Sequence, residues 1–273
     1  VAEVKRSSPS AGAIAATDNA VARARAYAAG GATAISVLCE PHWFGGSVDD
    51  LRAVRTAVAV PVLAKEFVVD ARQLDLLRGA GADLVLLLAV LHPGRRLARL
   101  VDRALALGLE PLVEAHDERE LEAVLATNAR VVGINNRDLR TLRAIRLRAL
   151  VPDDRLVVAE SGVRDTSLVA RWRAAGFDAA LVGEALMRAP DPAAAARAFV
   201  AAGAVPADPA AEARLPFVKI CGIVDEAGVP AACSNVTSLP PQAGGSAPVV
   251  DPHNPTEIAD CIVPLGTDDD LRS

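Results

Sequence analysis

The chain contains only three lysines, Lys5, Lys65 and Lys219, against 26 arginines. Lys65 follows the apolar run Pro61–Ala64, which is too short and too rich in strand-forming residues for a helix and predicts a buried strand that ends in a charge. Arg keeps its proton in proteins, whereas the pKa of Lys shifts readily on burial. Lys65 is therefore a candidate proton donor. The alternative is a lysine that extends from the strand end to solvent.

Lys65 is expected at the end of a strand, and that strand must belong to a sheet. A repeated unit of helix, glycine and apolar strand along the chain indicates that this sheet is parallel. We expect eight strands, at Val1–Lys5, Ala34–Leu38, Val60–Lys65, Asp83–Leu88, Glu110–Glu114, Val131–Ile134, Leu156–Glu160 and Ala179–Gly183. Strands that alternate with helices pair in parallel through right-handed crossovers. Eight of them can close into a (β/α)8 TIM barrel. The competing open sheet usually carries a G-x-G-x-x-G turn, and none follows a strand here.

Polar residues recur where six of these strands end. They are Glu3 and Lys5, Lys65 and Glu66, Glu114, Asn135 with Asn136 and Arg137, Glu160 with Ser161, and Glu184. In a parallel barrel the carboxyl ends of the strands form one rim, and the active site lies there. Each residue alone could be a solvated end of a strand, but their shared position predicts a site.

Small residues follow the last two expected strands, as Ser161-Gly162 and Gly183-Glu184. A short helix that begins near Glu184 would direct its N-terminus to the same place. Exposed backbone N–H groups in such turns bind phosphate. The sequence therefore predicts a phosphorylated ligand, unless the glycines only turn the chain.

Composition excludes several classes of protein. The net charge of −5 argues against a nucleic-acid surface, and no apolar run approaches the roughly 18 residues that span a bilayer. Without a signal peptide, we expect a cytoplasmic protein. The four cysteines are scattered and predict neither a disulfide framework nor a metal site. The chain begins with Val1 inside an expected strand, so we expect an N-terminal truncation.

The composition changes after residue 203. We expect the barrel to span residues 1–203 and a linker rich in Pro, Ala and Asp to span residues 204–214. Residues 215–273 should contain one strand, at Leu215–Ile223, and an irregular tail that is poorly ordered or loosely attached over Pro230–Ser273. The arginine-rich run from residue 137 to residue 148 is interpreted as a solvated face.

Seven motifs occur in an order that resembles one family. They are Ala2–Ser10, Ser36–Leu38 with Phe44–Ser47, Pro61–Phe67, Leu112–His116, Gly133–Leu139, Val158–Gly162 and Leu181–Met187. Together they resemble indole-3-glycerol phosphate synthase, a (β/α)8 enzyme of tryptophan biosynthesis, over residues 1 to about 203. The resemblance implies a carbon–carbon lyase that closes the ring of 1-(2-carboxyphenylamino)-1-deoxyribulose 5-phosphate with loss of CO₂ and water.

The resemblance also implies roles for individual residues. Lys65 matches the general acid, and Glu114 matches the second catalytic group. Lys5 matches the lysine that holds the carboxylate and phosphate side of the substrate, while Glu3 and Asn135 orient substrate hydroxyls and the lysines. The implied phosphate-binding residues are Lys5, Ser161, Gly162, Gly183 and Glu184; the implied substrate-binding residues are Ser8, Ser36, Phe44, Phe67, Arg137, Glu160 and Ser161. No metal or organic cofactor is implied.

Three features depart from the family pattern. Glu66 stands where the family usually has Asp, the segment between Leu139 and Leu156 is about a helical turn short, and the segment that covers the barrel mouth before the first strand is absent. His116 follows Glu114 by two positions, and we interpret it as a loop or helix-end residue. Trp43 is a candidate for the wall of an aromatic pocket.

The segment Phe217–Gly222 resembles the first strand of phosphoribosylanthranilate isomerase, an enzyme that is fused behind the synthase in some bacteria. Cys221 matches the general base of that family. One strand cannot close a barrel, so we expect a remnant of a fusion without isomerase activity.

The sequence leaves two other functions open. One is a different sugar-phosphate barrel enzyme, although an epimerase would need a metal and a His/Asp set that the sequence does not show. The other is a truncated, catalytically impaired barrel that only binds phosphorylated ligands. Both share the expected partner, a small sugar phosphate, and neither involves nucleic acid or membrane.

Overall fold

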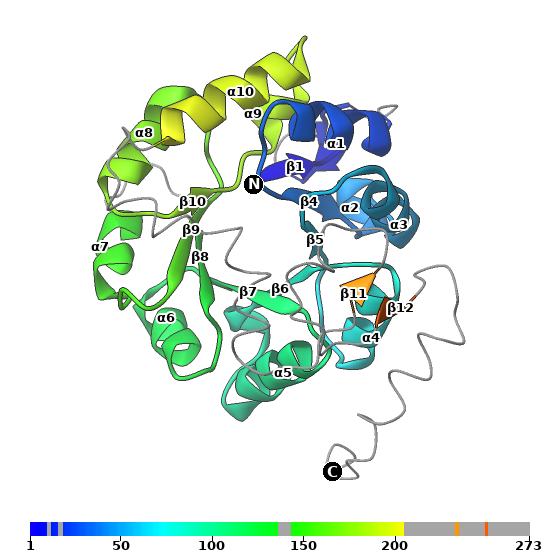
Figure 1. Cartoon of the computed structure of the whole chain (residues 1–273). Coiled ribbons are helices and arrows are strands. Elements are labelled where there is room, and N and C mark those ends of the chain that lie inside the picture. The colour runs from blue at the N-terminus through cyan, green and yellow to red at the C-terminus, as the bar shows by residue number, and fades with distance from the viewer. Residues whose placement is uncertain (10–11, 16–18, 136–142, 205–232, 235–248, 251–273) are drawn as a thin grey trace.

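The computed structural model describes residues 1–9, 12–15, 19–135, 143–204, 233–234 and 249–250. Its centre is a ring of eight parallel strands in the order β1-β4-β5-β6-β7-β8-β9-β10 (Figure 1). The strands are β1 Ala2–Val4, β4 Ile35–Leu38, β5 Val62–Lys65, β6 Leu84–Leu88, β7 Glu110–Ala115, β8 Val131–Asn135, β9 Leu156–Glu160 and β10 Ala179–Ala180. The predicted eight strands and the barrel fold are confirmed.

The ring closes between the first and the last of these strands. A parallel bridge joins Ala2 to Val182, and the backbone N–H of Glu3 donates to the carbonyl of Val182 at 2.8 Å. The strand β10 is shorter than the predicted strand Ala179–Gly183, but hydrogen bonds to both neighbouring strands continue past its end: Leu181 donates to Ala159 and Val182 donates to Val1. The other strands begin or end within two residues of the predicted positions.

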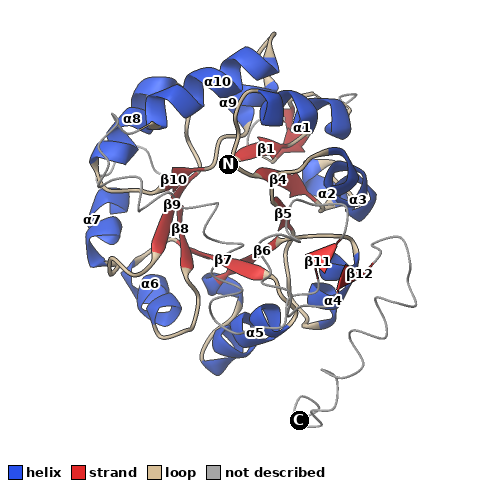
Figure 2. Ribbon diagram, in the orientation of Figure 1, coloured by secondary structure: helices blue, strands red, loops and turns tan. Residues whose placement is uncertain are grey.

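Helices surround the ring on its outside (Figure 2). They are α1 Ala20–Ala29, α3 Val48–Ala57, α4 Arg72–Gly79, α5 Arg95–Ala106, α6 Glu118–Leu125, α7 Arg143–Leu150, α8 Thr166–Ala174 and α10 Pro192–Gly203. Shorter turns follow three strands: α2 Pro41–Phe44, η1 Ala89–Leu91 and α9 Glu184–Met187. Several helices begin at an Asn, Asp or Ser whose side chain accepts a backbone N–H, as Asp117 does for α6.

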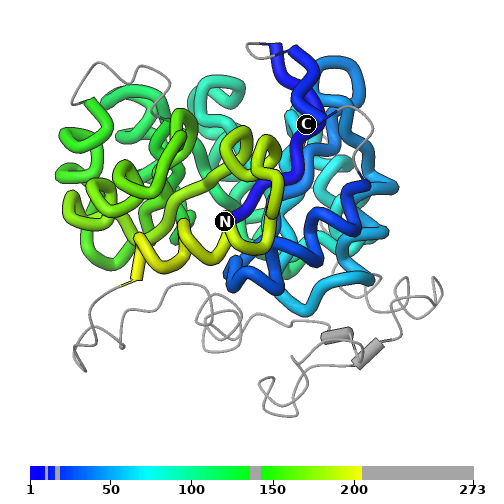
Figure 3. Tube along the Cα trace, turned by 90° about the horizontal axis from the view of Figure 1, so that it is seen from above, coloured from blue at the N-terminus to red at the C-terminus, as the bar shows by residue number. Residues whose placement is uncertain are grey.

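Two small pairs of strands lie outside the ring. The antiparallel pair β2 Ser7–Ser8 and β3 Gly12–Ala13 follows β1, and this dark-blue segment lies at the top of Figure 3. The parallel pair β11 Cys233–Ser234 and β12 Val249–Val250 is all that is described of the tail. The predicted strand at Leu215–Ile223, and the predicted linker apart from Ala204, lie outside the described residues, so the domain limits stay predictions.

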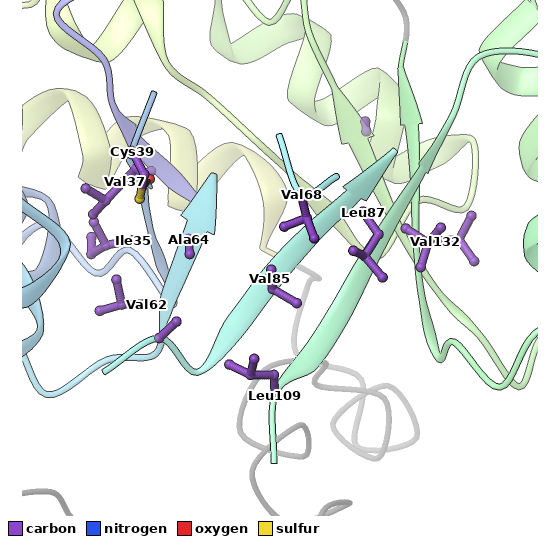
Figure 4. Packing of buried hydrophobic residues seen from close by; sticks show 14 of the residues in the cluster. Ile35, Val37, Cys39, Val62, Ala64, Val68, Val85, Leu87, Leu109 and Val132 are labelled. Atoms are coloured by element: carbon purple, nitrogen blue, oxygen red, sulfur yellow. Dashed lines mark hydrogen bonds between the residues drawn. The ribbon is translucent and has the colours of Figure 1, made fainter. Parts of the chain in front are cut away.

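Alternation along the strands produces two separate apolar layers. One side of each strand packs under the helices, as Ile35, Val62, Val85 and Val132 do in Figure 4. The other side fills the barrel with Ala34, Leu63, Leu84, Leu86, Leu112, Val131, Val158 and Leu181. This inner layer forms a floor on which the residues at the strand ends rest. Within the described part of the chain, no helix is long and apolar enough to cross a membrane.

The inner layer should contribute strongly to stability. We expect Leu112→Ala to lower the free energy of unfolding by about 3 kcal/mol, because Leu112 is fully enclosed and its removal leaves a cavity. Leu76 on α4 is exposed, and Leu76→Ala should change it by about 0.5 kcal/mol or less. Urea denaturation of the two variants measures both values. Equal effects would show that the inner layer is not a packed core.

Candidate functional site

A buried ammonium group lies between two buried carboxylates at the mouth of the barrel. Lys65, at the end of β5, forms an ion pair with Glu160 at the end of β9. The Nζ atom of Lys65 is also 3.5 Å from Oε2 of Glu114 on β7. The structure thus brings together three of the predicted residues from strands that are up to 95 residues apart in sequence.

The period of the strands explains why these side chains meet. Leu112 faces the inside of the barrel, and Glu114 follows it by two residues; Val158 and Glu160 have the same relation on β9. Side chains two apart on a strand share a face. The register pairs Asn135 with Glu160 and Glu114 with Gly133, so that polar residues form the layer above the apolar floor.

Gly133 makes room for one of the carboxylates. A Cβ atom at this position would collide with Oε1 of Glu160 and would lie 3.4 Å from Cα of Glu114. The absent side chain therefore leaves the space that Glu160 occupies. The sequence analysis did not identify this function of Gly133, since nothing along the chain indicates which side chain fills the gap.

Lys65, Glu114 and Glu160 each change the pKa values of the other two groups. Burial would lower the pKa of Lys65, but the carboxylates of Glu160, Glu114 and Glu3 outweigh burial and raise that pKa. Burial would raise the pKa of Glu114, yet the Lys65 charge and a hydrogen bond from Asn135 bring it below its ordinary value. Burial and the neighbouring Glu114 raise the pKa of Glu160 to about 8. Near neutral pH the cluster therefore combines a firmly held ammonium, an ionised Glu114 and a Glu160 that holds a proton more readily.

Two acceptor atoms in this cluster are buried and have no hydrogen-bond partner among the described residues. They are Oδ1 of Asn135 and Oε1 of Glu160. The amide nitrogen of Asn135 donates to Oε1 of Glu114 at 2.7 Å, which leaves its oxygen free of that contact. Buried acceptors without a partner destabilise a protein, so groups of this kind mark a place where a donor from a ligand or water would bind.

A second charged pair lies at the junction of β1 and the segment after β10. Nζ of Lys5 is 2.9 Å from Oε1 of Glu3, and the hydroxyl of Ser36 donates to the other oxygen of Glu3. A Cβ atom on Gly183 would lie 2.7 Å from Oε1 of Glu3, the oxygen that pairs with Lys5, and 3.2 Å from Nζ of Lys5. Gly183 directly precedes α9, which begins at Glu184 as predicted. The Lys5 amine therefore lies next to the predicted phosphate-binding turn.

The chain turns sharply after β9. Ser161 has φ 67°, an unusual value for a residue other than glycine, and Gly162 has φ 72°. The predicted role of Ser161 and Gly162 in phosphate binding stays a prediction.

Aromatic residues lie on the rim next to β4 and β5. The rings of Phe44 and Phe67 are 6.1 Å apart and tilted by 54°. Phe67 is partly exposed, and Trp43 is largely exposed. Ser8 is buried on β2. Arg137 lies outside the described residues, so its predicted contact with substrate stays a prediction.

His116 is closer to the cluster than the sequence analysis expected. Its Nε2 atom is 3.3 Å from Oε1 of Glu114, and its Nδ1 atom is 3.0 Å from Oε2 of Glu120 on α6. The prediction of a residue at a helix end is correct, since α6 begins two residues later. The spacing of two from Glu114 was the signal for a shared face.

Comparison with known proteins adds a family to this geometry. The family model described as indole-3-glycerol phosphate synthase matches residues 1–199. The chain belongs to this family. Indole-3-glycerol phosphate synthase of Kineococcus radiotolerans is 50% identical over 212 residues, which are 76% of this chain and 77% of that protein. The enzyme of the same name from a Nocardioides species is 52% identical over 202 residues, which are 72% of this chain and 78% of that protein.

Solved structures agree with the fold. A 3-hexulose-6-phosphate synthase superimposes with a TM-score of 0.59 at 23% identity, over 74% of this chain and 98% of that one. At this identity the similarity shows the barrel and nothing of its chemistry. The resemblance expected from the seven motifs is confirmed by the family match.

The close fit at Gly133 can be tested by substitution. We expect Gly133→Ala to displace the Glu160 carboxylate from Lys65 and to lower the free energy of unfolding by about 3 kcal/mol, because a buried charge loses its partner. Gly79, at the end of α4, has open space around its missing Cβ, so Gly79→Ala should leave stability equal or slightly higher. Urea denaturation and a structure of the variant measure the effect. An unshifted Glu160 in a variant of native stability would contradict it.

Proposed function

We propose that this chain is an indole-3-glycerol phosphate synthase that acts on 1-(2-carboxyphenylamino)-1-deoxyribulose 5-phosphate. The observation that carries the proposal is the Lys65 ammonium between the buried Glu114 and Glu160 carboxylates, in a chain that belongs to this family. The reaction joins a ring carbon to a carbonyl carbon and then removes CO₂ and water, and each of these steps needs a placed acid or base.

Lys65 is proposed as the general acid for ring closure. Attack of the ring carbon turns the substrate carbonyl into an oxyanion, which an adjacent ammonium stabilises and protonates. The pKa of Lys65 is raised, so this ammonium does not lose its proton to the neighbouring carboxylates. The alkoxide that forms from the substrate carbonyl is a much stronger base than a carboxylate and can take the proton. Glu160 keeps the ammonium in place at the strand ends.

Glu114 is proposed as the base of the dehydration step. Its lowered pKa keeps it ionised near neutral pH, and the amide of Asn135 fixes one of its oxygens. An ionised carboxylate in this position can remove the proton from the carbon next to nitrogen while an acid protonates the departing hydroxyl. The side-chain oxygen of Asn135 has no hydrogen-bond partner within the described part of the chain, and we propose that it accepts a hydrogen bond from a substrate hydroxyl.

The remaining residues are proposed to hold the two ends of the substrate. Lys5, oriented by Glu3, lies beside Gly183 and supplies positive charge to the phosphate together with the N–H groups of Ser161, Gly162 and Glu184. Phe44, Phe67 and Trp43 offer apolar surface to the anthranilate ring, with Ser8, Ser36 and Arg137 as further contacts. The cytoplasmic location and the fusion remnant at Phe217–Gly222 also stay predictions.

The direct test is to incubate the purified chain with this substrate and to follow the fluorescence of the indole product. Turnover supports the proposal. Absence of turnover, together with protection against thermal unfolding by the substrate, would instead support a barrel that only binds phosphorylated ligands. Protection is measurable because a ligand that binds only the folded state raises the unfolding temperature.

Replacement of Lys65 by arginine tests the acid. We expect Lys65→Arg to retain the positive charge between the carboxylates but to lower kcat by a factor on the order of 10² or more, since the larger, planar guanidinium cannot place its proton where the compact ammonium does. Steady-state kinetics measure kcat, and circular dichroism verifies the fold. A variant with the rate of the original chain would remove Lys65 from the acid role.

Glu114 has a matched control on its own strand. Glu110 begins β7, is equally buried, and pairs with Arg130 at 2.7 Å, at the opposite end of the barrel. We expect Glu114→Gln to lower kcat by a factor on the order of 10² with little change in KM, because the base acts after binding. Glu110→Gln should reduce stability but leave kcat within about twofold. Similar kcat values for the two variants would exclude Glu114 as the base.

A further inference from the structure

His116 links the buried cluster to the surface of the barrel. Its ring lies between two carboxylates, with Nε2 3.3 Å from Glu114 and Nδ1 3.0 Å from Glu120. The exposed fractions of the side chains are 1% for Glu160, 6% for Glu114, 14% for Lys65 and 38% for His116. His116 is therefore more accessible to water than any of the three charged groups of the cluster.

The ring is held in this position by the start of α6. Oε2 of Glu120 accepts a hydrogen bond from the backbone N–H of His116 at 2.8 Å. The same oxygen is 3.0 Å from Nδ1 of the ring. Asp117 caps the helix and accepts the backbone N–H of Glu120, also at 2.8 Å. Backbone and ring of His116 are thus fixed by one carboxylate, which leaves Nε2 directed at Glu114.

The proposed reaction takes up one proton from solvent in each turnover. The substrate carboxylate leaves as neutral CO₂, and the carbonyl oxygen leaves as water with two protons. One of these protons comes from the carbon next to nitrogen, whose C–H electrons form the new double bond of the ring. The other must come from outside the substrate, so the cluster of Lys65, Glu114 and Glu160 needs a path to solvent.

We propose that His116, held by Glu120, carries this proton from solvent to Glu114, from which it reaches Lys65. The two transfers span 3.3 Å from His116 to Glu114 and 3.5 Å from Glu114 to Lys65. Imidazole accepts and releases protons near neutral pH more readily than any other side chain. The inference rests on the proposed function, since it concerns the proton balance of that reaction.

Buffer rescue tests the path in the full chain. We expect His116→Ala to lower kcat about tenfold in dilute buffer, with KM nearly unchanged, because Glu114 loses its contact with the surface. Added imidazole should restore most of kcat, whereas the same concentration of a bulky buffer of similar range should not. A kcat that is unchanged, or that is lowered but insensitive to imidazole, would overturn the proposal.

A second variant separates proton transfer from positioning. His116→Gln can still donate a hydrogen bond to Glu114 but cannot exchange a proton, so its kcat in dilute buffer should be as low as that of His116→Ala. A His116→Gln variant with the kcat of the original chain would show that the residue only orients Glu114, and the proton path would be wrong. Thermal unfolding verifies that both variants are folded.

Glu120 has its own control on the same helix turn. Glu120→Gln removes the charge that holds the ring, and we expect kcat to fall about threefold to tenfold. Glu118, which is exposed and lies 3.4 Å from Arg143, occupies the same turn of α6. Glu118→Gln should leave kcat unchanged, and equal effects of the two substitutions would overturn the role of Glu120. If the original chain shows no turnover, the proposed function fails first; if it turns over and His116 variants are unaffected, only the proton path fails.

Discussion

The site depends on one buried ammonium, that of Lys65, which lies between the carboxyl groups of Glu160 and Glu114. Lys65 would be strongly disfavoured inside the barrel without Glu160 and Glu114, and either carboxylate would be equally disfavoured without Lys65. Because the three groups stabilise one another, their positions are tightly fixed relative to each other. The same mutual dependence sets their protonation, which is what acid–base chemistry requires of them.

Backbone register is the means by which the fold assembles this cluster. Lys65, Glu114 and Glu160 each lie two residues beyond an apolar residue of the inner layer, namely Leu63, Leu112 and Val158, so the inner layer sets the height of this cluster in the barrel. Gly133 then determines where the Glu160 carboxyl group can lie within this layer, since any side chain at position 133 would occupy the same space. Packing and chemistry are therefore linked: a shift of one residue in register would move the charges to the helix side of the sheet.

The sequence predicted the barrel because its strands are short apolar runs separated by helices and glycines, and local patterns of this kind survive in the fold. It also predicted the rim residues, since the ends of parallel strands must lie together. It could not predict that Glu160 rather than Glu114 pairs most closely with Lys65, because strand order does not give side-chain distances. For the same reason His116 was interpreted as a helix-end residue, although its ring also contacts Glu114.

The bridge between Ala2 and Val182 makes the barrel a ring with a seam. Lys5 follows the first strand of the ring and Gly183 follows the last strand. The two residues therefore lie side by side at this seam. An anion bound beside both Lys5 and Gly183 would link the first strand of the ring to the last one. Occupancy by ligand would then protect the backbone amides of β1 and β10 from exchange more than those of the strands across the ring.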